Sequence, residues 1–148
     1  MSDWLYPLSS QKDAQGYPRY HFELRSGQTT PDTSARSLRL IVNDGPGQGP
    51  WVVHLNRVSG KVQPRDRVWF YYGLADADLG IVALGTVTDL DEVDGVSFRW
   101  QKTATRRLLN TPVPAAVVRQ YVHRPRAALW PLDPHPTLVR KLLKAAGI

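Results

Sequence analysis

The sequence predicts an α+β fold in which a β-sheet of five or six strands is accompanied by peripheral helices. The first observation is the stretch from residue 65 to residue 89, which contains two strand patterns separated by a short polar break. The second is a set of shorter runs in which apolar and polar residues alternate. The third is a helical pattern near the carboxyl end. At 148 residues the chain has the size of one ordinary domain, so we expect a single domain over residues 1–148.

The central strand pair is predicted for residues 67–72 and 80–88. Side chains of the first run alternate between two faces, and both faces carry rings: Val68, Phe70 and Tyr72 on one, Arg67, Trp69 and Tyr71 on the other. The second run is β-branched and nearly uncharged, and it contains Gly85, which predicts a buried strand that is bent or closely approached there. We expect the pair to form a hairpin and the core to contain these side chains: Val68, Phe70, Ile81, Leu84, Val87, Phe98 and Trp100.

Shorter strands are predicted on both sides of this hairpin. Residues 3–8 suit an edge strand that stops at Pro7, and residues 20–24 alternate as a second strand. Residues 51–55 follow a loop with three glycines and two prolines at 43–50, so Trp51 begins an extended segment. The last strand is predicted for residues 96–102.

Helices are predicted in three places. Residues 34–42 suit either a helix or a strand, and we favour a helix or helical turn. Residues 112–122 predict a helix with Pro114 in its first turn. Residues 137–146 predict a terminal helix that ends at Gly147, with Arg140, Lys141 and Lys144 facing solvent. Between these helices, residues 123–136 are rich in proline and are predicted to be irregular.

The central stretch also resembles a known family. Residues 64–68, Pro-Arg-Asp-Arg-Val, lead into an aromatic strand, a loop and then Gly-Ile-Val-Ala-x-Gly-x-Val at 80–87. This order resembles the central motif of EVE domains, which are PUA-like β-barrels related to YTH domains, although the chain has Arg65 where the family usually has glycine. Trp51 and Asn56 are similar to a Trp and Asn segment that precedes this strand in the family. The resemblance covers residues 51–89 and implies a PUA-like mixed β-barrel.

The charge of the chain is unevenly distributed. The formal net charge is +6, residues 73–96 contain six acids and no Lys or Arg, and residues 97–148 contain ten Lys or Arg and one acid, Asp133. Charge segregated in this way gives one face a positive potential that attracts a polyanion. The alternative is a solvated surface on a basic protein.

A set of rings could form a pocket for a base that is flipped out of a duplex. Such a pocket needs aromatic walls and a few polar groups on the base edge. The candidate rings are Trp4, Tyr6, Trp51, Tyr71 and Tyr72. Asn56 is the best amide for bidentate base contacts, and Gly73 would let the backbone approach a ligand. For each ring alone, core packing is the alternative. In EVE-like domains the pocket lies beside the strand equivalent to 67–72, so the resemblance favours Trp51, Tyr71 and Tyr72.

The predicted function is therefore recognition of a modified base, such as methylated or hydroxymethylated cytosine in DNA. Arg99, Lys102, Arg106 and Arg107 would contact flanking phosphates. The family's association with modification-dependent defence favours DNA over RNA and suggests a partner nuclease. The alternatives are an RNA-binding module of the same fold and a protein–protein adaptor whose rings form a patch.

Catalysis is not expected. The chain has no cysteine, and His21, His54, His123 and His135 have no mutual metal-ligand spacing. Asp76 and Asp78 are alternate residues that could hold Mg²⁺ in a nucleotide or nucleic-acid enzyme, but a solvated acidic turn is the commoner case. No cofactor is expected. The sequence has no run of about 20 apolar residues and no cationic and apolar segment after Met1, so we expect a cytoplasmic protein without a membrane span.

Overall fold

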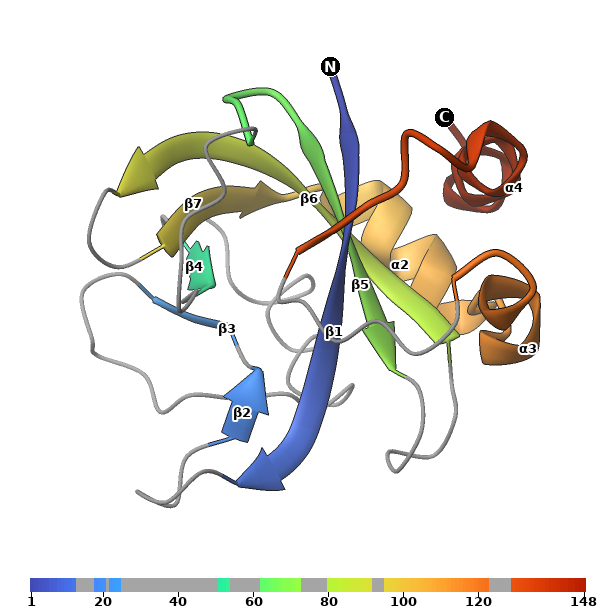
Figure 1. Cartoon of the computed structure of the whole chain (residues 1–148), viewed down its shortest axis with the longest axis horizontal. Helices are drawn as coiled ribbons and strands as arrows, with labels where there is room; N and C mark the ends of the chain where they lie inside the picture. The colour runs from blue at the N-terminus through green and yellow to red at the C-terminus, as the bar shows by residue number, and fades with distance from the viewer. Residues whose placement is uncertain are drawn as a thin grey trace.

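The computed structural model describes residues 1–12, 18–20, 22–24, 51–53, 62–72, 80–91, 95–122 and 129–148. These residues form one mixed β-sheet, with helices grouped at one side of it (Figure 1). The α+β class is therefore confirmed. The predicted helix at 34–42 and the loop at 43–50 lie outside the described residues. The described helices are all too short or too polar to cross a membrane.

The sheet runs in the order β2-β1-β5-β6-β7-β4-β3, and β8 pairs with β1 outside this path. The strands are β1 (Asp3–Lys12), β2 (Pro18–Tyr20), β3 (Phe22–Leu24), β4 (Trp51–Val53), β5 (Arg67–Tyr72), β6 (Gly80–Asp91), β7 (Gly95–Trp100) and β8 (Trp130–Pro131). The pairing of β1 with β5 is parallel, and the others are antiparallel. Eight strands exceed the predicted five or six because the segment at 20–24 contributes to both β2 and β3, and because β8 is additional.

The two ends of this path, β2 and β3, are separated in the chain by His21 alone. Within the described residues no ladder joins β2 to β3, so hydrogen bonds between strands leave the sheet open. β2 pairs with β1 and β3 pairs with β4. One short segment of chain therefore continues from one edge of the sheet to the other.

The predicted hairpin is confirmed as β5 and β6. Its register runs from Arg67 opposite Thr86 to Tyr72 opposite Gly80, with one irregularity after Phe70. Gly85 is approached closely, as its position in the strand predicts. A Cβ atom there would lie 2.7 Å from Cδ2 of Phe98, which is closer than real side chains come.

Both faces of the sheet are covered by buried side chains. One face carries the ring cluster, which contains most of the buried aromatic residues: Trp4, Tyr6, Trp51, Phe70, Tyr72, Phe98 and Trp100. The other face carries Trp69 and Tyr71 and is covered by helices α2 (Lys102–Asn110), α3 (Ala115–Arg119) and α4 (Pro136–Ala146). All seven predicted core residues are buried: Val68, Phe70, Ile81, Leu84, Val87, Phe98 and Trp100.

Two predicted helices are present, and the predicted end of one strand is wrong. α4 ends at Gly147, whose φ of 78° is the left-handed conformation that terminates a helix. α3 is shorter than the predicted 112–122, and Pro114 precedes it as the N-cap instead of lying in its first turn. The strand predicted to reach residue 102 ends at Trp100, and Lys102 begins α2. The prediction was wrong there because α2 has no side-chain cap and no acid in its first turn, so the usual start signals of a helix are missing.

Candidate nucleic-acid interface

The five candidate rings are all buried in the described structure. Their exposed fractions are 5% for Trp4, 1% for Tyr6, 5% for Trp51, 3% for Tyr71 and 4% for Tyr72. Four belong to the ring cluster, whereas Tyr71 lies on the face that the helices cover. Each ring therefore contributes to the core, which was the alternative for each of them taken alone.

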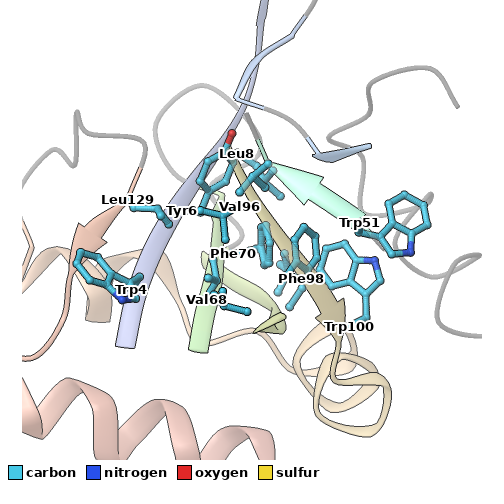
Figure 2. Packing of buried hydrophobic residues seen from close by; sticks show 14 of the residues in the cluster. Trp4, Tyr6, Leu8, Trp51, Val68, Phe70, Val96, Phe98, Trp100 and Leu129 are labelled. Atoms are coloured by element: carbon cyan, nitrogen blue, oxygen red, sulfur yellow. The ribbon is translucent and has the colours of Figure 1, made fainter. Parts of the chain in front are cut away.

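Trp51 packs among rings that come from other strands. It pairs with Phe98 in the ladder between β4 and β7, and its ring centroid lies 6.2 Å from that of Trp100 (Figure 2). Trp100 in turn lies 4.7 Å from Phe98 and 4.9 Å from Phe70, centroid to centroid. The partner of Trp51 is thus Trp100, which the sequence indicated only as a core residue.

The sheet register separates the rings that the resemblance favours. Trp51 lies opposite Phe98, which lies opposite Val87 of β6, next to the residue of β6 that pairs with the first residue of β5. Tyr72 is the last residue of β5 and lies opposite Gly80, at the other end of the hairpin. The register does not bring these two rings together. The polar groups predicted for the base edge, Asn56 and Gly73, lie outside the described residues, as do Asp76 and Asp78.

Asp66 has a structural role. It lies in the Pro-Arg-Asp-Arg-Val motif at 64–68, which resembles the central motif of EVE domains. Its carboxylate is 2% exposed and accepts hydrogen bonds from the backbone N–H groups of Ser2 and Gln63 at 2.9 Å, and from Nε1 of Trp4 at 3.0 Å. Burial raises the pKa of Asp66, but these hydrogen bonds outweigh burial and hold the pKa below its usual range. The carboxylate fixes Trp4, so this ring is not available for stacking on a base.

Asp3 forms a second buried network. Arg67 donates from Nε to Oδ1 of Asp3 at 2.7 Å and from Nη2 to Oδ2 at 3.0 Å, and Nε1 of Trp69 donates to Oδ1 at 2.8 Å. This bidentate pair joins β1 to β5, where Asp3 lies opposite Arg67 in the parallel ladder. Sequence reasoning missed it, because no local pattern indicates which strand lies beside β1.

The predicted phosphate-binding side chains lie on β7 and α2. Arg99, Arg106 and Arg107 are exposed, and Lys102 is half-buried. Lys102 and Arg106 are four residues apart, so they share one side of α2, while Arg107 turns toward α4. The prediction of a strand followed by two arginines is corrected, because both arginines belong to a helix.

A groove between α2 and α4 gathers further cations. It has a volume of about 590 Å³ and is lined by Arg107, Asn110, Thr111, Lys141, Lys144 and Ala145. The sequence indicated Lys141 and Lys144 as solvent-facing positions, and both are exposed. Their spacing on α4 could have indicated a shared face, but only the packing of α2 against α4 brings Arg107 to them. Within the described residues no group of three His, Cys, Asp or Glu side chains could hold a metal ion.

Comparisons with known proteins identify no relative. No family model matches this chain, and neither a curated protein nor a solved structure matches it. The likeness to EVE domains therefore stays a prediction from the motifs at 51–89.

Proposed function

We propose that the chain is a nucleic-acid-binding module that recognises a modified base, such as methylated or hydroxymethylated cytosine in DNA. The observation that supports it best is the exposed basic surface over β7, α2 and α4. Arg99, Arg106, Arg107, Lys141 and Lys144 are exposed there, and Asp133 is the one acid of residues 97–148. Such a surface attracts the phosphate backbone and steers its approach.

A barrel is the second part of the proposal. Residues 18–24 pair with β1 through β2 and with β4 through β3, so a single short segment of chain links both edges of the sheet. A sheet whose edges are linked in this way can curl around its ring cluster as a PUA-like barrel does. The resemblance at 51–89 supports the same fold.

The base site is proposed beside Trp51. Trp51 and Trp100 lie on the same face of the sheet and touch each other, with their centroids 6.2 Å apart, so the base is proposed to stack on the side of Trp51 that faces away from Trp100. Asn56 and Gly73 are the proposed polar contacts on the base edge. Stacking of a base on one such ring contributes about 1–3 kcal/mol. The protein is proposed to act in the cytoplasm, without catalysis or a cofactor of its own, together with a partner nuclease.

Fluorescence polarisation with matched duplexes tests this proposal. The duplexes contain cytosine, 5-methylcytosine, 5-hydroxymethylcytosine or N6-methyladenine at one position, and binding is measured at two salt concentrations. We expect one modified duplex to bind more tightly than the others, with affinity for all of them falling steeply as salt rises. Structured RNA serves as a competitor, and preferential competition by RNA would favour the RNA-binding alternative.

A pair of core variants separates base recognition from stability. Trp51→Ala removes a buried side chain from the ring cluster, and Leu138→Ala removes one of α4 from the cluster on the opposite face of the sheet. Each is expected to lower the free energy of unfolding by about 2–5 kcal/mol. We expect only Trp51→Ala to lose the preference for the modified duplex. Equal binding of all duplexes by the wild type would contradict base recognition and leave nucleic-acid binding by the basic surface.

A further inference from the structure

The groove between α2 and α4 brings together three cations from two helices. Arg107 comes from the last turn of α2, and Lys141 and Lys144 come from α4. The remaining lining residues, Asn110, Thr111 and Ala145, are uncharged. Among the residues that the structure describes, no acid lines this groove, so these three cations give it a positive potential.

Two of these exposed cations lie against neighbouring groups of the fold. A Cβ atom on Gly147 would lie 2.9 Å from Cζ of Arg107, so the guanidinium lies against the backbone turn that ends α4. Nζ of Lys141 lies 5.3 Å from the ring centroid of Tyr121. Both contacts restrict the side chains without neutralising their charge. Side chains ordered in this way lose less conformational entropy when a ligand binds.

Helix stabilisation accounts for part of this arrangement but not for all of it. A cation in the last turn of a helix interacts favourably with the terminal carbonyl groups, and this applies to Arg107 in α2 and Lys144 in α4. Some of those carbonyl groups already accept backbone hydrogen bonds: the carbonyl of Arg107 from Thr111, and the carbonyl of Lys144 from Gly147. Lys141 lies before the last turn. Three like charges in one groove repel one another, and an anion between them relieves that repulsion.

We propose that this groove binds backbone phosphates of a nucleic acid, and that Arg107, Lys141 and Lys144 contact them. This inference rests on the proposed function and adds a defined contact on α4 to the phosphate-binding residues that the sequence predicts, which are Arg99, Lys102, Arg106 and Arg107. Arg107 turns away from Lys102 and Arg106 on α2, so the groove is a contact separate from the one those two side chains can make. A guanidinium and two ammonium groups suit phosphate groups as ligands. Contacts to phosphates carry no sequence information.

Two double variants with equal loss of charge test the groove. Lys141→Gln/Lys144→Gln removes two cations from it, whereas Arg65→Gln/Arg140→Gln removes two exposed cations outside it. Binding of an unmodified duplex is followed by fluorescence polarisation over a range of salt concentrations. Two lost phosphate contacts should reduce the slope of log K against log salt by about 1.8, and extrapolation of that slope predicts affinity roughly 30-fold weaker at about 0.15 M salt. The control variant is expected to keep the wild-type slope.

Each other outcome overturns a defined part of the reasoning. An unchanged slope in Lys141→Gln/Lys144→Gln, while the wild type binds, rejects the groove and leaves the proposed function standing. Equal losses in both double variants also reject it, because binding then follows net charge alone. A wild-type protein that binds no duplex and no structured RNA rejects the proposed function and the groove together. All four substituted side chains are exposed, so both double variants are expected to fold. Circular dichroism checks that they do.

Discussion

Replacing Arg65 with glycine is expected to stabilise the protein. Within the described residues, Arg65 is the one residue other than glycine with a positive φ, at 76°. Asp66 donates its backbone N–H to the carbonyl of Gln63 at 3.1 Å, so Pro64 and Arg65 are the central residues of a four-residue turn. A positive φ at the third position is the pattern of a type II turn, which favours glycine there. This is also the position at which EVE domains usually have glycine.

The expected gain follows from two opposing terms. The left-handed conformation costs a residue with a Cβ atom about 1–2 kcal/mol. Arg65→Gly removes this cost. Glycine also has greater conformational freedom in the unfolded chain, which lowers the gain in stability by about 0.5–1 kcal/mol. The Arg65 side chain is exposed, so its loss adds little. The free energy of unfolding should therefore rise by about 0.5–1 kcal/mol, which corresponds to about 1–4 °C in Tm for a chain of this size.

Urea denaturation of the wild type, Arg65→Gly and Arg65→Ala provides the assay. Arg65→Ala removes the same charge but keeps a Cβ atom, so it should not share the gain. We expect a higher urea midpoint for Arg65→Gly with an unchanged m-value. If Arg65→Gly is no more stable than Arg65→Ala, the strain assigned to this turn is refuted.

Two further predictions concern the core. Asp66→Asn should lower the free energy of unfolding by about 2–3 kcal/mol near pH 7, because an amide cannot accept all the hydrogen bonds that Trp4 and the backbone donate to the carboxylate. The pKa of Asp66 is lowered on folding, so its stabilisation is complete above the unfolded pKa of about 3.9 and is lost as pH falls through the folded pKa. Urea denaturation should therefore show the gap between wild type and variant narrowing below about pH 4, and a constant gap would contradict the assignment. Gly85→Ala should lower the free energy of unfolding by about 1–3 kcal/mol, because its Cβ atom would collide with Phe98; Thr88→Ala, an exposed position on the same strand, serves as the control and should remain close to wild type in the same assay.

Local patterns were sufficient for several elements. The hairpin of β5 and β6 was predictable because alternation along a strand is a property of consecutive residues. The end of α4 was predictable because Gly147 adopts a conformation that other residues avoid. α2 was not predictable in this way, since its polar sequence lacks start signals and its buried side chains, such as Leu108, depend on packing against β6.

The candidate site was predictable only as a list of residue types. The sequence indicated aromatic rings and a basic last third, and both are present in the described residues. It could not indicate that Trp51 lies beside Trp100, because that contact depends on the pairing of β4 with β7. It could not indicate the groove either, since Arg107 and Lys144 come together only through the packing of α2 against α4.

The sequence by itself determined which side chains share a face of each strand and helix, because the repeat of each element is set by the backbone. Only the tertiary structure decided what covers each face. Val68, Phe70 and Tyr72 turn toward the ring cluster, whereas Trp69 and Tyr71 turn toward the helices. Both sets are apolar and differ little in composition, so the choice depends on contacts between segments that are distant in the chain.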